Sequence, residues 1–359
     1  MLLCTANFLL LLLVALQHLG SFCAYTCRRG YVSRLHRFSA TESFDAQVLD
    51  YPFVILPGFG NDMVDYINPM KRDSAFGLVN VLQSRGIKNV FVVPIRRTDW
   101  LNILWGIFKP DFWRGECRPL DLFRFYCNQV DVTVRHARMS TGNPVILVGH
   151  SAGGWLGRAI LSDGFWMKDI DNNDHGNQTR STELVAGLVS LGSPHYPPVA
   201  NASDMTRGAI RHVDFHYPGA FLSGSIKKES TDRIFYVTVG GAAVLGNSTA
   251  DRGSASKFAA NSYLQVTGNS WNRGEEIGDG VVPLSASHLE GALQITIPEA
   301  WHSIQAPGDM WYGGDALIDK WLQPTLQCID DYVSSKNRSF SQFVTMRSEN
   351  VSQADIRNF

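Results

Sequence analysis

The stretch PVILVGHSAGGWLGRAIL, residues 144–161, decides how the chain folds, because it joins a strand pattern to a helix pattern through a G-x-S-x-G motif. Residues 144–150 form a short apolar run that predicts a buried strand, and residues 154–161 predict a helix. Between them, Ser151 lies in a turn typical of a reactive serine raised above the end of a sheet. The alternative is a glycine-rich helix start capped by Ser151. The strand before the motif and the helix after it favour the reactive turn.

Short apolar runs alternate with helix patterns on both sides of this motif. Strands are predicted at 52–58, 89–95, 184–194, 233–241 and 292–298, and helices at 78–86, 120–138 and 315–333. Such alternation, with nearly continuous apolar strands, predicts an α/β architecture: a mostly parallel sheet with helices on both faces. Together with the serine turn, it predicts the α/β-hydrolase fold in one domain at 46–333.

Two long segments, 195–232 and 242–278, interrupt the alternation and are polar and rich in aromatic residues. Insertions after the strands of such a sheet lie over its carboxyl edge, where ligands bind. We therefore expect lid-like, substrate-facing loops rather than a second domain. Residues 334–359 are polar and predict a loose tail.

A reactive serine also needs hydrogen-bond donors for the oxyanion that forms during acyl transfer. The N–H of Ala152, the residue after the serine, is the expected first donor. The second donor is expected from the loop after the first strand, P-G-F-G at 57–60, where the Phe59 N–H is preferred and the Gly60 N–H comes next. A plain turn is the alternative for this loop.

The base and its acid should follow the serine along the chain in the order acid, then histidine. Asp279, between two glycines, is the preferred acid, although a turn aspartate that bonds its own backbone is the alternative. His302 follows the strand at 292–298, where the base is expected, whereas His288 precedes that strand. We predict Ser151, Asp279 and His302 as the catalytic triad and His288 as a packing or hydrogen-bonding residue. The rival acids are Asp232, Asp251 and Asp309.

Composition argues against several classes of function. The 359 residues include 32 basic and 33 acidic ones, so no global field favours nucleic acid or an acidic membrane surface. The chain contains no H-E-x-x-H motif, no paired C-x-x-C and no glycine-rich phosphate loop, so neither a metal nor a cofactor is predicted. His212 and His216 have helical spacing but no third ligand signal, and are interpreted as a surface or lid feature.

The N-terminus predicts targeting rather than folded structure. An apolar run from Phe8 to Leu16 is too short to span a bilayer, so residues 1–24 are predicted to be a signal peptide, with an N-terminal anchor or buried helix as the alternative. Residues 25–45 form a basic transit-like or linker segment. The predicted compartment is the secretory lumen or the exterior, with an algal plastid reached through a two-part presequence as the alternative. No later stretch is apolar enough to span a membrane. N-glycosylation sequons occur at Asn177, Asn201, Asn247, Asn337 and Asn350.

Cys117 and Cys127 flank a short loop-to-helix segment, so a disulfide between them is geometrically conceivable. Cys127 also lies on an apolar helical face, where a buried free thiol is the alternative. An oxidising compartment would favour the disulfide. The sequence leaves both interpretations open.

Several further motifs are more specific than the serine turn: RRTDWLN (96–102), FWRGECRP (112–119), LGSPHYPP (191–198), GDGVVPLSASHLEGA (278–292) and MWYGG (310–314). By these motifs the chain resembles plant and algal α/β-hydrolases related to the luminal domain of GPI inositol-deacylases, over roughly residues 50–325. The resemblance implies Ser151, Asp279 and His302 as the triad and assigns no role to His288. The multiple membrane spans of GPI inositol-deacylases have no counterpart in this sequence, so their activity does not transfer.

The sequence therefore predicts a serine hydrolase that cleaves carboxylic esters, with a small-molecule or lipid ester as substrate. Aromatic residues in the insertions suggest a lipid acyl group and peripheral membrane contact: Phe215, Tyr217, Phe221 and Trp271. An acyltransferase with the same triad is one alternative, and a non-catalytic binding protein on a hydrolase scaffold is the other.

Overall fold

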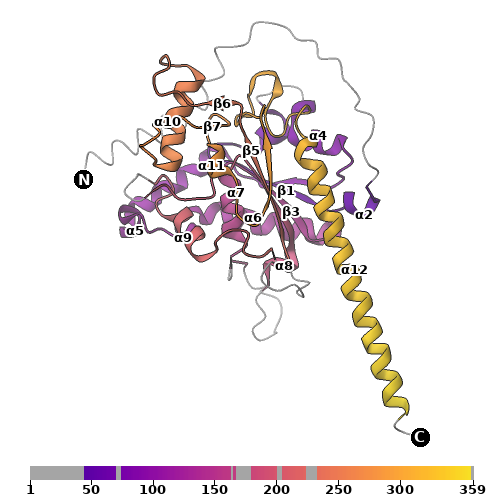
Figure 1. Cartoon of the computed structure of the whole chain (residues 1–359). Coiled ribbons are helices and arrows are strands. Elements are labelled where there is room, and N and C mark those ends of the chain that lie inside the picture. Colours follow the sequence, from indigo (N-terminus) through magenta and orange to yellow (C-terminus); the bar gives the residue numbers. More distant parts are fainter. Residues whose placement is uncertain are drawn as a thin grey trace.

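A computed structural model describes residues 44–69, 74–162, 165–166, 179–199, 204–223 and 233–356 (Figure 1). The predicted signal peptide, most of the basic segment, the rival acid Asp232 and the sequons at Asn177 and Asn201 lie outside the described residues. Within the described ranges, no helix combines the length and the apolar character needed to cross a membrane.

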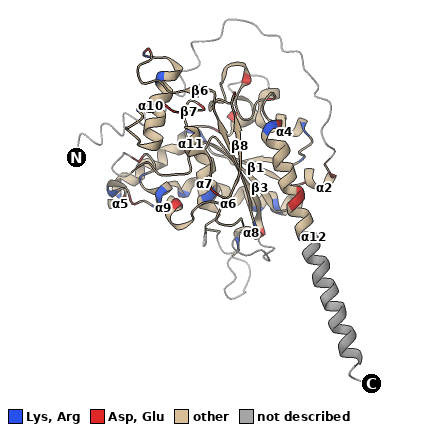
Figure 2. Ribbon diagram, in the orientation of Figure 1, with Lys and Arg blue, Asp and Glu red and all other residues tan. Residues whose placement is uncertain are grey.

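A six-stranded sheet forms the centre of the molecule, and every neighbouring pair of its strands is parallel. Its order is β2 (Val90–Val92), β1 (Phe53–Leu56), β3 (Val145–His150), β4 (Val185–Leu191), β5 (Phe235–Gly241) and β8 (Leu293–Ile297). These strands contain no Lys, Arg, Asp or Glu, and Figure 2 shows the positions of such residues, coloured on the ribbon, scattered over the surrounding elements. The predicted parallel sheet is confirmed, and each of its strands lies within one of the predicted strand ranges.

Helices cover both faces of the sheet (Figure 1). Val54 and Leu56 of β1 belong to an apolar core with α6 (Pro119–Thr141), α7 (Ala152–Ile160) and α9 (Ala209–His216). Phe53 and Ile55, on the opposite face of the same strand, join a second core with α2 (Ala46–Leu49), α4 (Leu78–Ser84) and α12 (Asp319–Ile356). Because both faces of a strand are buried, its apolar run is continuous rather than alternating.

The connections after the strands form the carboxyl edge of the sheet. After β1 come α3 (Val64–Ile67) and the 3₁₀ helix η3 (Ser74–Phe76). After β2 come the 3₁₀ helix η4 (Arg97–Phe108) and α5 (Pro110–Arg114). The segment 195–232 contains α9, and the segment 242–278 contains β6 (Val244–Leu245), α10 (Ala255–Thr267) and β7 (Ile277–Gly278). β6 and β7 pair in an antiparallel manner, and the Val199 N–H donates to the Thr267 carbonyl at 2.9 Å. The two inserted segments therefore contact each other.

The remaining short elements are α8 (Ser181–Leu184), α11 (Leu284–Ser287) and η5 (Pro307–Asp309). The structure also bears on two expectations about the tail and the cysteines. α12 continues through the predicted tail as far as Ile356, and residues 334–356 contain no glycine or proline that would end a helix. Cys117 and Cys127 are both free and buried in the same apolar core, so the free-thiol alternative holds.

Candidate active site

Ser151 occupies the strained turn between β3 and α7. Its backbone has φ 53° and ψ −122°, a conformation that non-glycine residues rarely adopt, and its N–H donates to the Leu191 carbonyl at 2.9 Å. A Cβ on Gly149 would stand 2.5 Å from the backbone of Gly153, and one on Gly153 would stand 2.2 Å from the Leu56 carbonyl oxygen. The spacing of the motif thus follows from the close approach of strand and helix around the serine.

His302 lies in the loop after β8, and its side chain contacts both other members of the predicted triad. Its Nε2 is 3.0 Å from the Ser151 Oγ, and its Nδ1 is 2.7 Å from the Asp279 Oδ2. The His302 N–H also donates to the Asp279 carbonyl at 2.9 Å. The structure therefore brings Ser151, His302 and Asp279 together in a single hydrogen-bonded row, the arrangement that activates a serine.

The Asp279 carboxylate is buried, with 1% of the residue exposed, and accepts four hydrogen bonds. Its Oδ1 accepts the N–H groups of Val281 and Val282 at 2.9 and 2.7 Å. Its Oδ2 accepts His302 Nδ1–H and the Tyr312 hydroxyl, both at 2.7 Å. These donors satisfy a charge that would otherwise be costly to bury.

Tyr312 is a residue of this site that the sequence did not reveal. Its hydroxyl donates to Asp279 and accepts the Gly241 N–H at 2.8 Å, which connects the end of β5 to the acid loop. Burial, the Asp279 charge and the hydrogen bond to that carboxylate raise the pKa of Tyr312 well above its ordinary value, so the phenol is a neutral donor. Only its place in the MWYGG motif marked it, and that motif carries no chemical signal of its own.

The loop after β1 packs directly against the serine turn. A Cβ on Gly58 would stand 2.8 Å from the Ser151 Cβ, so only glycine allows this approach. In the described part of the chain, neither the Phe59 nor the Ala152 N–H donates a hydrogen bond to a protein acceptor. Both predicted oxyanion donors are therefore open to an incoming group, and the Phe59 ring is fixed by an edge contact with Trp100 at 5.1 Å.

His288 lies between β5 and β8 and contacts neither Ser151 nor His302 by any hydrogen bond in the described part of the chain. Its Nδ1 lies 3.2 Å from the Thr238 Oγ1 in β5, and its Nε2 lies 3.0 Å from the Thr296 Oγ1 in β8. His288 therefore bridges two neighbouring strands, which is consistent with its predicted hydrogen-bonding role. Partial burial lowers the pKa of His288, so the ring is held neutral between the two hydroxyls.

The rival acids do not replace Asp279. Both ring nitrogens of His302 are already paired, Nδ1 with Asp279 and Nε2 with Ser151, so neither Asp251 nor Asp309 takes the place of the acid. The His212 and His216 rings on α9 have centroids 4.4 Å apart and are tilted by 46° to each other. Within the ranges that the structure covers, no group of three or more His, Cys, Asp or Glu residues is placed to hold a metal ion, and this includes any group built on His212 and His216.

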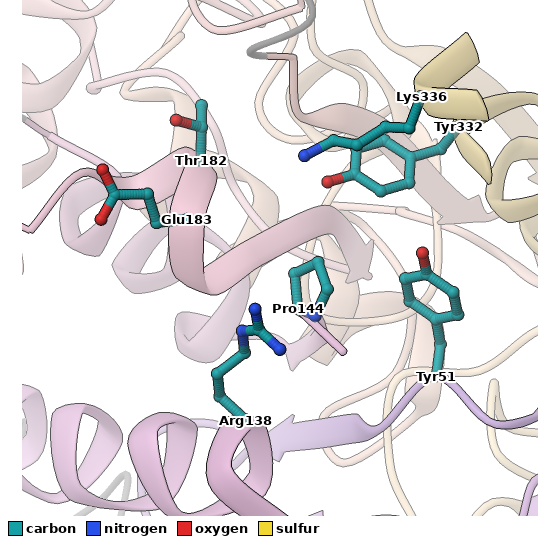
Figure 3. A pocket seen from close by; sticks show the side chains of 7 residues that line it. All are labelled: Tyr51, Arg138, Pro144, Thr182, Glu183, Tyr332 and Lys336. Carbon is teal, nitrogen blue, oxygen red and sulfur yellow. The ribbon is translucent and has the colours of Figure 1, made fainter. Parts of the chain in front are cut away.

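Two cavities lie apart from these residues. The first, about 390 Å³, is at the amino edge of the sheet, where α6, α8 and α12 meet the chain just before β1 and β3 (Figure 3). The second, about 430 Å³, lies between the two inserted segments. Its lining residues come from the ranges 196–199, 266–276 and 285–286. Neither cavity is lined by Ser151 or His302, and neither contains a histidine or cysteine.

No family model matches the chain, and no curated protein matches it. Among solved structures, the chain is similar to the mature lipase BlEst2 of Bacillus licheniformis, at 15% identity and a TM-score of 0.43, over 80% of this chain and 96% of that one. It is similar to the phospholipase PlaB of Legionella pneumophila at 11% identity and a TM-score of 0.43, over 79% of this chain and 62% of that one. EstA of Clostridium botulinum gives 11% identity and a TM-score of 0.41, over 88% and 97% of the two chains.

These identities and TM-scores are low, so the fold is defined by the chain's own sheet order, by its serine turn and by the order of Ser151, Asp279 and His302 along the chain. None of the comparisons supports the narrower resemblance to GPI inositol-deacylases, which rests on the sequence motifs. Six parallel strands with helices on both faces, and Ser151 at the carboxyl end of β3, give this chain the α/β-hydrolase fold.

Proposed function

We propose that the chain is a serine hydrolase that cleaves carboxylic esters. The observation that carries this proposal is the unbroken row from Ser151 Oγ through His302 to Asp279, with hydrogen bonds of 3.0 and 2.7 Å. Two unengaged backbone N–H groups, from Phe59 and Ala152, flank the serine turn. Nucleophile, base, orienting acid and oxyanion donors are the parts that acyl transfer requires.

In the first half-reaction, Ser151 Oγ attacks the ester carbonyl carbon while His302 Nε2 takes its proton. The carbonyl electron pair moves onto oxygen, and the Phe59 and Ala152 N–H groups stabilise that oxyanion. The tetrahedral intermediate then collapses, the alcohol leaves with the proton from His302, and an acyl-Ser151 ester remains. Asp279 orients the ring and stabilises its charged form.

In the second half-reaction, water attacks the acyl-Ser151 carbonyl while His302 Nε2 takes a proton from it. Collapse of the second tetrahedral intermediate returns that proton to Ser151 Oγ and releases the carboxylic acid. An alcohol in place of water would make the same site an acyltransferase. The products, acid or new ester, separate these two functions.

A lipid ester is the substrate class that the surface supports best. Phe215 and Trp271, one on each inserted segment, are 79% and 95% exposed, and Trp105 and Phe108 of η4 are 69% and 75% exposed. All of these segments follow strands of the sheet and so lie on the side of Ser151. Large aromatic side chains exposed around a site favour contact with a lipid surface, and we include peripheral membrane binding in the proposal.

The test is a panel of p-nitrophenyl esters of increasing acyl length, together with phospholipid and acylated inositol lipids, with product analysis by mass spectrometry. Wild type should release carboxylic acid from at least one lipid ester, and Ser151→Ala should not. Release of acyl groups from the acylated inositol lipids would support the narrower likeness to GPI inositol-deacylases. Equal release by wild type and Ser151→Ala across the panel would contradict the proposed hydrolase.

Location in the secretory pathway is part of the same proposal. The sequon residues Asn247 and Asn337 are exposed, as glycosylation requires. Treatment of the protein from its native source with a peptide N-glycosidase should increase its electrophoretic mobility. Unchanged mobility, together with an uncleaved N-terminus, would contradict the secretory location.

A further inference from the structure

One tyrosine hydroxyl connects the loop after β1 to the serine turn. The Tyr66 hydroxyl accepts the Gly58 N–H at 2.9 Å and the Asn61 Nδ2–H at 2.9 Å, and it lies 2.9 Å from the His150 Nδ1. His150 directly precedes Ser151, and its Nε2 lies 3.0 Å from the His302 backbone carbonyl oxygen. A single chain of hydrogen bonds therefore runs from the oxyanion loop, through the turn, to the loop of the base.

The direction of each bond in this chain is fixed. A carbonyl oxygen only accepts, so the His150 Nε2 carries a proton and donates to His302. Burial, followed by the proximity of His302, lowers the pKa of His150 to about 3, so its Nδ1 carries no proton at neutral pH. The Tyr66 hydroxyl consequently donates to the His150 Nδ1, and its oxygen accepts from Gly58 and Asn61. Every polar atom of the row has a partner.

These bonds bear on the distances that the reaction needs. The His302 backbone is held on one side by the Asp279 carbonyl, which accepts its N–H at 2.9 Å, and on the other by His150. The His150 and His302 rings lie 5.0 Å apart. The same Tyr66 hydroxyl holds Gly58, the neighbour of the oxyanion donor Phe59. The positions of base, nucleophile and oxyanion donor are thus linked through two side chains.

We propose that His150, held in one tautomer by Tyr66, is a positioning residue that keeps His302 aligned with Ser151. The inference rests on the proposed hydrolase function and deepens it. His150 and Tyr66 are 2% and 0% exposed, so they act through His302 and Gly58 rather than on the substrate. Their loss should therefore lower kcat and leave KM nearly unchanged, because misalignment of reacting groups by about 1 Å costs about 100-fold in rate.

Two substitutions at one position separate this role from mere packing. In His150→Gln, the amide nitrogen takes the place of Nε2 and still donates to the His302 carbonyl. In His150→Asn, the amide takes the place of Nδ1, next to Tyr66, and nothing reaches His302. The two variants are similar in polarity, and the asparagine variant keeps the group nearer the backbone. Because asparagine is smaller, a packing role predicts a larger loss of stability in His150→Asn with kcat per active site unchanged in both variants. The positioning role predicts a loss of kcat per active site that glutamine alone partly rescues.

The experiment measures kcat and KM for p-nitrophenyl ester hydrolysis, with active sites counted by a fluorophosphonate probe. Relative to wild type, kcat should fall by about 10-fold or less in His150→Gln and by about 100-fold in His150→Asn, in line with the loss of an orienting partner. Equal kcat losses in the two variants, or a greater loss in glutamine, would overturn the proposal.

Tyr66→Phe tests the same row if the His150 variants do not fold. It removes the nearer donor to His150 Nδ1, at 2.9 Å against 3.4 Å for the Asn61 Nδ2, and the acceptor of the Gly58 N–H. We therefore expect kcat to fall by about 10- to 100-fold with little change in KM. A Tyr66→Phe variant with the wild-type kcat would overturn the proposal. If wild type neither reacts with the fluorophosphonate nor hydrolyses any ester, the hydrolase function fails instead, which distinguishes the two failures.

Discussion

The buried tyrosine hydroxyls at the two edges of the sheet differ in their hydrogen bonding. At the carboxyl edge, the Tyr66, Tyr263 and Tyr312 hydroxyls are each bonded on two or more sides to the loops around Ser151. At the amino edge, Tyr51 and Tyr332 meet edge to face with ring centroids 6.2 Å apart, and the buried Tyr332 hydroxyl has no partner in the described part of the chain (Figure 3).

This difference indicates where the chain uses buried polar groups to fix geometry. Phenols at the carboxyl edge hold backbone N–H groups of Gly58, Gly241 and Gly280 in place at 2.8 to 2.9 Å. Loops held in place in this way keep neighbouring groups such as the Phe59 N–H preorganised, as transition-state stabilisation requires. Phenols at the amino edge mainly fill space beside a cavity. Substitutions at the two edges should therefore have different consequences.

The largest effect is expected where the carboxyl edge holds the base. His302→Ala removes the proposed base for Ser151, and kcat/KM should fall on the order of 10⁴-fold or more. His288→Ala is the matched control, because it breaks the bonds to Thr238 and Thr296. It should lower the melting temperature while kcat/KM stays within a few-fold of wild type. Ester hydrolysis kinetics of both variants test this assignment. If kcat/KM fell strongly in His288→Ala and stayed near wild type in His302→Ala, His288 would be the base.

The next effect concerns the pH dependence of stability. Burial lowers the pKa of His150 from 6.5 to about 3, so the unfolded chain binds a proton below pH 6.5 that the folded chain does not bind. The contribution of His150 to stability is therefore fully present above pH 6.5 and is lost as the pH falls toward 3, at about 1.4 kcal/mol per pH unit.

Urea unfolding of wild type and His150→Gln from neutral pH down to the acid limit measures this contribution. The difference in free energy of unfolding between the two proteins should be constant above pH 6.5 and should then shift steadily against wild type as the pH falls. Parallel curves throughout would show that the pKa of His150 is the same in the folded and unfolded protein, which would contradict the lowered pKa assigned to the buried ring.

The smallest effects compare one tyrosine from each edge. Tyr312→Phe removes a donor from Asp279, which leaves more negative charge for the imidazolium of His302. We expect kcat to fall by about 10-fold and the acid limb of the kcat/KM profile to move to higher pH. Tyr332→Phe removes a buried hydroxyl without a partner, so the free energy of unfolding should stay the same or rise by about 1 kcal/mol, with an unchanged pH profile.

pH profiles and urea unfolding of these two variants test the comparison between the edges directly. If Tyr332→Phe moved the acid limb and Tyr312→Phe did not, the assignment of polar function to the carboxyl edge would be wrong. Equal destabilisation by both variants would indicate that an unseen partner, such as a bound water, satisfies the Tyr332 hydroxyl.

The fold was predictable because its signals are local. Each strand is a short apolar run, and the G-x-S-x-G turn is dictated by the close approach of β3 and α7. The chain order of such sites singled out Asp279 and His302, and in the structure His302 contacts both Ser151 and Asp279. Their roles in a reaction remain the proposal to be tested.

The supporting residues were not predictable from sequence. Tyr66 and His150 are 84 residues apart, and Tyr312 is 33 residues from Asp279, so no spacing or period reveals these contacts. The alternatives left open for Cys117 and Cys127 also depended on a distance that only the folded chain defines. Local patterns identify the reactive groups, whereas the side chains that orient them emerge from tertiary packing.

The central claim is that Ser151 is a nucleophile activated by His302. A fluorophosphonate probe, followed by digestion and mass spectrometry, tests it most directly. We predict a covalent adduct on the peptide that contains Ser151, formed quickly by wild type, very slowly by His302→Ala and not at all by Ser151→Ala. An adduct on another residue, or equal labelling of wild type and Ser151→Ala, would contradict the claim.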